Sequence, residues 1–86
     1  MFDDLWWNNK CRRYAEKLRE THSGRASTSR GQTLRVYDEL MKASKTLVDG
    51  HAHDYLLELD RRLDDGEFTP NATKKIRKAM RYGEAL

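Results

Sequence analysis

The chain carries a dense group of cationic side chains close to its C-terminus, between Thr69 and Gly83. These candidate binding residues are Lys74, Lys75, Arg77, Lys78 and Arg81. At about 100° per residue, all but Lys75 fall on one side of a helix, and Lys75 flanks them. Guanidinium and ammonium groups in such an array bind phosphate oxygens or the carboxylates of another protein. The pattern predicts contact with a DNA or RNA backbone or with an acidic protein surface.

A second set of candidate binding residues lies in the N-terminal third of the chain. These are Trp6, Lys10, Arg13, Lys17, Arg25 and Arg30. Trp6 begins a helical stripe that continues through Lys10, Arg13 and Lys17, so an aromatic ring borders a cationic row. Such a ring can stack on an unpaired base or anchor a protein contact. The alternative is that Trp6 packs over its own lysine or arginine as a cation–π pair, or that it closes one end of the bundle.

The net charge of +3 hides a strong segregation along the chain. Residues 10–35 hold eight basic and two acidic side chains, residues 36–68 hold four and nine, and residues 69–86 hold five and one. Two interpretations follow. Either the acidic middle neutralises the basic ends inside the fold, or the basic ends form one continuous cationic surface for a polyanion.

The residue types that support metal binding or catalysis are present but poorly arranged. His51 and His53 lie beside Asp54, whereas Cys11 and His22 are distant in sequence. A zinc site needs convergent ligands with recognisable spacing, and a lone His-x-His without a second tight pair is a weak signal. The acidic residues lie on expected solvent faces, where no desolvation would shift a pKa towards neutrality. We therefore predict no metal, no cofactor and no enzymatic activity.

Composition favours an all-α fold in one domain over residues 1–86. The chain is 37% apolar and 36% charged, with one proline and five glycines, which suits helices that each give one face to a core. We expect a compact bundle or orthogonal array of about four helices, over 4–21, 32–48, 52–64 and 70–83. A flexible Ser/Gly/Arg loop is expected at 23–31.

Periodicity predicts which side chains of each helix face the core. In the first helix they are Trp7, Cys11, Tyr14 and Leu18. In the second they are Thr33, Leu34, Tyr37, Leu40, Met41, Ser44, Leu47 and Val48. In the third they are Ala52, Tyr55, Leu56, Leu59 and Leu63, and in the fourth Ala72, Ile76, Ala79 and Gly83. Gly50 is expected to end the second helix with a left-handed cap, and Thr69 to cap the fourth.

The turn between the last two helices, residues 65–70, is broadly similar to the turn of a helix-turn-helix. In that interpretation Asn71 and Thr73, with Lys74 and Arg77, would approach base edges in a major groove, and Lys78 and Arg81 would contact phosphates. The sequence departs from the pattern where the preceding helix needs a small residue, because Leu59, Arg61 and Arg62 occupy the candidate positions.

Two function classes remain. The first is a small non-enzymatic protein that binds nucleic-acid backbone through basic helix faces. The second is a regulator or inhibitor, of the kind that small phage proteins provide, which docks on a larger enzyme or complex through Trp6, Leu57 or the basic helix. No apolar run is long enough for a membrane span, and the lone cysteine suits a reducing compartment, so we expect a cytoplasmic protein. The offset aromatic stripes also permit a homodimer.

Overall fold

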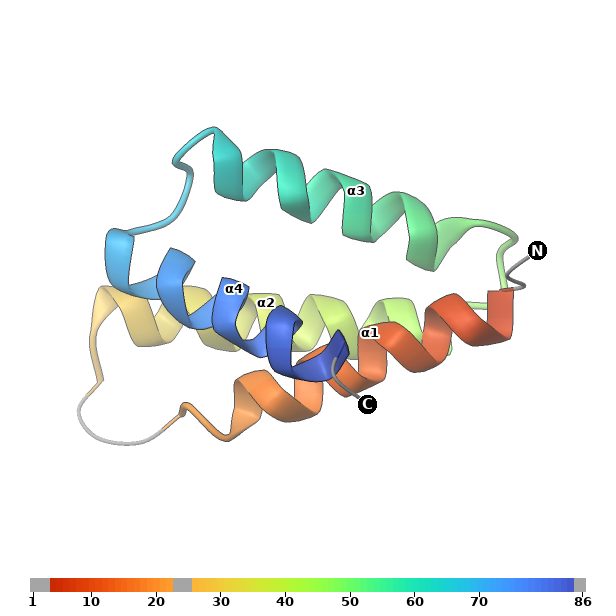
Figure 1. The fold of residues 1–86 in the computed structure, drawn as a ribbon, viewed down its shortest axis with the longest axis horizontal. Coiled ribbons are helices and arrows are strands. Elements are labelled where there is room, and N and C mark those ends of the chain that lie inside the picture. Colours follow the sequence, from red (N-terminus) through yellow and green to blue (C-terminus); the bar gives the residue numbers. More distant parts are fainter. Residues whose placement is uncertain (1–3, 23–25, 85–86) are drawn as a thin grey trace.

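Four α-helices make up most of the described chain in this computed structural model, which describes residues 4–22 and 26–84 (Figure 1). They are α1 (Asp4–Arg19), α2 (Thr28–Lys45), α3 (His51–Asp64) and α4 (Pro70–Glu84). No strand occurs among these residues, and the helices pack into a body of 39 × 24 × 21 Å. The predicted all-α fold with about four helices is confirmed.

The packing of the bundle is centred on α1, which contacts each of the other three helices. In contrast, α3 and α4 barely touch, and Figure 1 shows α3 lying apart from α4 along one edge of the molecule. The two helices of a helix-turn-helix pack against each other. The similarity of the 65–70 turn to that motif therefore gains no support from the packing.

The core consists of one buried stripe from each helix. The stripes are Cys11, Tyr14, Ala15 and Leu18; Thr33, Val36, Leu40 and Ala43; Ala52, Leu56, Leu59 and Leu63; and Ala72, Ile76, Ala79 and Gly83. The prediction for α4 is confirmed in full. In α1 and α3 it is confirmed except that Trp7 and Tyr55 are only half-buried.

The start of α2 differs from the prediction. The helix begins at Thr28, so the part of the predicted 23–31 loop from Thr28 onward is helical. Ser27 is the N-cap, and its side-chain oxygen accepts a hydrogen bond from the Arg30 backbone N–H at 3.1 Å. A serine in a Ser/Thr/Gly-rich stretch is typical both of a loop and of a cap, which is why composition alone made the loop too long. Residues 23–25, including Arg25, lie outside the described residues.

The end of α2 was also placed wrongly, because the helix stops at Lys45. Leu47 and Val48, predicted to face the core, are 93% and 67% exposed, and Leu34 is 39% exposed. Contacts with α1 hold the chain in a loop here: Asn8 donates to the Thr46 carbonyl at 3.0 Å. Gly50 has the positive φ of 75° that was expected, but it precedes α3 instead of ending α2.

The α3–α4 connection fixes the direction of α4. Gly66, with φ of 76°, allows the Glu67 N–H to donate back to the Arg62 carbonyl at 3.2 Å, which closes the end of α3. The predicted cap at Thr69 is confirmed, since its hydroxyl accepts from the Ala72 N–H at 3.2 Å. The Thr69 N–H also donates to the Gln32 side chain at 2.8 Å, so α4 starts from a point tied to α2.

Cys11 lies in the core, as predicted, and we expect its thiol to be chemically inert in the folded protein. It is fully buried, and desolvation raises its pKa to about 12, so almost no thiolate forms near neutral pH. Iodoacetamide followed by mass spectrometry should detect no modification under native conditions and complete modification in denaturant. Rapid alkylation of the native protein would contradict this burial.

Candidate nucleic-acid interface

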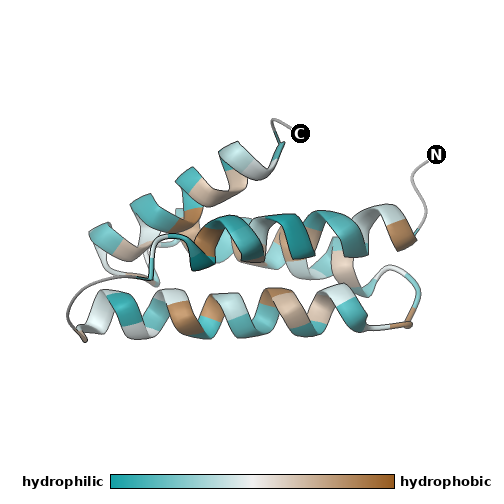
Figure 2. Ribbon diagram, turned by 90° about the horizontal axis from the view of Figure 1, so that it is seen from below, coloured by the Kyte–Doolittle hydropathy of each residue, from teal (hydrophilic) through white to brown (hydrophobic). Residues whose placement is uncertain are grey.

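The two sides of α4 differ in character. The inner side consists of small and apolar residues that pack on α1 and α2, and the outer side is strongly cationic. Lys74, Arg77, Lys78 and Arg81 are exposed, and Lys75 is half-buried beside them. The colouring of α4 in Figure 2 changes between hydrophilic and hydrophobic along the helix, as expected for an amphipathic helix. The helix therefore presents its cations to solvent while its other side holds it in the core.

Most of these cations are not neutralised by the chain's own carboxylates. Arg77 pairs with Asp64 at the end of α3, at 2.7 Å. Lys74, Lys75, Lys78 and Arg81 form no ion pair within the described residues. Lys74, Lys78 and Arg81 follow i, i+4, i+7 spacing on the exposed side, and we call these three residues the α4 basic surface.

Two shallow hollows border the α4 basic surface. One, of about 340 Å³, is lined by Lys74, Arg77, Lys78, Arg81 and Tyr82. The other, of about 250 Å³, lies where α4 meets the end of α1 and is lined by Lys17, Glu20, Thr21, Lys78, Ala79 and Tyr82. Lys78 and Tyr82 line both. Cationic side chains thus line both hollows, where they can contact the phosphates of an anionic polymer.

Two of the predicted N-terminal cations are bound inside the molecule instead of joining this surface. The Lys10 ammonium is 2.6 Å from Glu84, and its side chain is only 13% exposed. The Arg13 Nε donates to the Gly83 carbonyl at 3.2 Å. Both contacts tie α1 to the last turn of α4. The predicted continuous cationic surface therefore does not extend over Lys10 and Arg13.

Lys17 is the member of the N-terminal set that lies beside the α4 basic surface. It lines the hollow that also contains Lys78, and its nearest carboxylate, Glu20, is a loose partner at 3.8 Å. Arg30 lies half-buried in the first turn of α2. Burial lowers the pKa of His22, and the neighbouring charges of Arg30 and Lys75 lower it further.

Trp6 packs against Trp7 and Lys10 of its own helix. Its ring meets that of Trp7 edge-on with centroids 4.7 Å apart, and the Lys10 ammonium lies 4.4 Å from its centroid. Trp6 is half-buried. The cation–π pair with its own lysine is confirmed, and Trp6 does not line either of the two α4 hollows.

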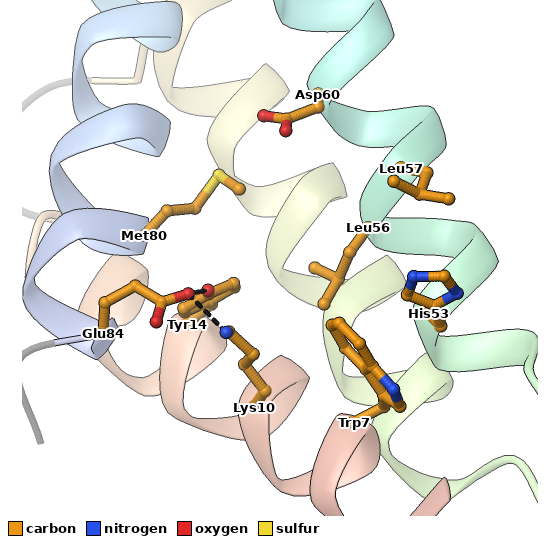
Figure 3. A pocket seen from close by; sticks show the side chains of 9 residues that line it. All are labelled: Trp7, Lys10, Tyr14, His53, Leu56, Leu57, Asp60, Met80 and Glu84. Carbon is orange, nitrogen blue, oxygen red and sulfur yellow. Dashed lines mark hydrogen bonds and ion pairs between the residues drawn. The ribbon is translucent and has the colours of Figure 1, made fainter. Parts of the chain in front are cut away.

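A further pocket of about 230 Å³ lies between α1, α3 and α4 (Figure 3). Trp7, with its ring centroid 4.3 Å from that of His53, lines one side, and Met80 lines the other. Glu84 accepts hydrogen bonds from Lys10 and from the Tyr14 hydroxyl across the rim. Glu84, Lys10 and Tyr14 thus use their polar atoms to bind one another, which favours a structural role for these three side chains.

Stability should depend on pH through Glu84. Partial burial raises the pKa of Glu84, but the hydrogen bonds from Lys10 and Tyr14 together lower it below its usual value of 4.5. A depressed folded-state pKa gives stability that is present above the unfolded pKa and lost as pH falls through the folded one. We expect Glu84→Gln to be less stable than wild type in urea at about pH 7, and the difference in stability to shrink as pH falls below 4.5 and through the lowered pKa of Glu84. A pH-independent difference would contradict this contribution.

In the part of the chain that the structure describes, the histidines, acidic residues and Cys11 do not come together as metal ligands. Among the described residues, no group of three His, Cys, Asp or Glu side chains is placed to hold a metal ion. His22 instead packs edge-on against Tyr37, with centroids 5.8 Å apart. Nor does any helix in the described part of the chain have the length and apolar character to cross a membrane.

Sequence reasoning missed Tyr82 as a candidate residue. Its ring is 52% exposed and borders both hollows beside the α4 basic surface. The signal was present, because at 100° per residue Tyr82 falls between Lys75 and Lys78 within the cationic arc. The adjacency of Lys17 could not be inferred in this way, since it depends on how α1 crosses α4.

Comparison with family models, with curated proteins and with solved structures finds no match. Function is therefore inferred from the chain's own residues.

Proposed function

We propose that this chain is a non-enzymatic nucleic-acid-binding protein that holds the phosphate backbone on the α4 basic surface, with Lys17 as an additional contact. The supporting observation is that Lys74, Lys78 and Arg81 are exposed at helical spacing and have no internal carboxylate partner in the described chain. Such cations bind by releasing the counterions condensed on a polyanion. The affinity is then independent of base sequence.

The acidic residues of the chain support this assignment by their position. Three of the carboxylates of α3 and the following turn, Glu58, Asp65 and Glu67, bind Arg61 or Arg62. They therefore neutralise cations of their own region, and only Asp64 reaches α4. Within the described residues, Lys74, Lys78 and Arg81 of α4 therefore receive no carboxylate from α3, which leaves them accessible to a polyanion.

Fluorescence anisotropy of a labelled oligonucleotide of about 20 nucleotides tests the proposal. We expect saturable binding of several unrelated sequences with similar affinity, in the micromolar range at low salt. Absence of binding to any of them at low salt would overturn the proposal.

The alternative, a regulator that docks on a larger protein, predicts a different result from purification. The tagged protein would then be isolated in a stoichiometric complex that survives nuclease treatment and moderate salt. Under the nucleic-acid proposal, nuclease should release whatever co-purifies with the protein. The sequence also permits a homodimer without requiring one, and sedimentation at two concentrations would test whether it forms.

A further inference from the structure

Tyr82 differs from the other tyrosines in what its side chain contacts. Tyr14 is 3% exposed, and its hydroxyl donates to Glu84; Tyr55 is half-buried, and its hydroxyl donates to Glu39 at 2.8 Å. Tyr37 is half-buried and packs against the core. Tyr82 is 52% exposed, and its hydroxyl forms no hydrogen bond within the described part of the chain. Neither packing in the core nor a hydrogen bond within the described chain explains why a tyrosine occupies this position.

The surroundings of Tyr82 are cationic on two sides. One hollow brings Lys74, Arg77 and Arg81 to the ring, and the other brings Lys17. Lys78 lines both hollows, and its ammonium lies 5.8 Å from the ring centroid. That distance is close to the outer limit of about 6 Å for a cation–π contact, so Lys78 is held loosely and can turn to a phosphate. A flat aromatic surface therefore lies between two places where backbone phosphates can bind.

We propose that the nucleic acid bound by α4 is single-stranded and that one of its bases stacks on the Tyr82 ring. This inference rests on the proposed function and specifies its substrate. In a duplex each base is covered above and below by its neighbours, so an exposed ring on the protein surface has no base face to contact. In a single strand the base faces are accessible, and cations flanking an aromatic side chain are the arrangement that binds them without sequence preference.

The test compares Tyr82→Ala and Tyr82→Phe with wild type, using labelled oligothymidylate and a labelled duplex of equal length in anisotropy titrations. Tyr82→Ala should weaken single-strand binding about 5- to 150-fold, the loss expected for one stacked base. Its duplex binding should stay within about twofold of wild type, because no charge has been removed. Tyr82→Phe keeps the ring and should bind the single strand as wild type does.

A matched control removes an exposed apolar side chain elsewhere: Leu47→Ala, at the 93% exposed loop position, should change neither affinity. Circular dichroism should show all variants equally helical, since Tyr82 lies outside the buried core.

The outcomes separate the two proposals. If Tyr82→Ala binds the single strand as tightly as wild type, or loses the same factor on both oligonucleotides, the stacking inference is overturned while backbone binding by α4 stands. If wild type binds neither oligonucleotide, the proposed function fails and the stacking inference fails with it.

Discussion

Replacing Lys74, Lys78 and Arg81 together with glutamate is expected to weaken oligonucleotide binding strongly and leave the fold intact. Each lysine or arginine close to a polyanionic surface contributes about 1 kcal/mol, so losing three reduces affinity by about 100-fold or more, and the new carboxylates repel phosphates as well. The three side chains are exposed and have no ion pair within the described residues, so their loss should have little effect on unfolding. Anisotropy and a thermal melt measure the two effects.

The matched control reverses three exposed cations of α2: Arg35→Glu, Lys42→Glu and Lys45→Glu. These side chains also form no ion pair in the described chain, and the change in net charge is the same. Binding by this control should stay close to wild type. If both triple variants lose affinity equally, net charge and not the α4 basic surface determines binding.

Gly83→Ala is expected to destabilise the protein, although alanine is the better helix former. A Cβ at this position would lie 2.5 Å from the Cδ1 atom of Tyr14. The Tyr14 ring is 3% exposed, and its hydroxyl is bonded to Glu84, so it has little freedom to move aside. Overpacking of this kind costs about 1–3 kcal/mol, whereas the gain in helix propensity is about 1 kcal/mol at most. A net loss should lower the melting temperature by about 4–8 °C per kcal/mol.

Gly31→Ala is the control for this substitution. Gly31 lies in α2, is exposed, and has no atom within 4 Å of the position that a Cβ would take. Without a clash, the alanine should raise stability by about 0.5–1 kcal/mol. A Gly83→Ala protein as stable as Gly31→Ala would show that α4 does not approach Tyr14 as closely as described.

The parts of the fold that could be predicted are those set by local periodicity. The buried line of α4 and the Thr69 cap follow from residue types at fixed spacing, and both are confirmed. The ends of α2 are different, because Ser27 had to be distinguished as a cap and the stop at Lys45 depends on contacts with α1. The Asn8–Thr46 hydrogen bond joins residues 38 apart in sequence, and a contact of this kind leaves no periodic signal.

The candidate site likewise contains features that local periodicity predicts and features that depend on long-range contacts. Periodicity identified the exposed cations of α4 because one helix carries them all. It could not show that Lys10 and Arg13 are held by Glu84 and Gly83, which are distant in sequence. Nor could it show that Arg77 is paired with Asp64 and Lys78 is not. These assignments depend on which helices lie side by side.

The salt dependence of binding is the most direct test of the claim that outward cations on α4 contact phosphates. For a single strand, the slope of log affinity against log salt is about −0.7 for each phosphate neutralised. Lys17 with the α4 basic surface should therefore give a slope of about −3 for wild type and a much shallower one after the triple reversal on α4. Binding with a slope near zero, or a slope that the reversal leaves unchanged, would contradict the account.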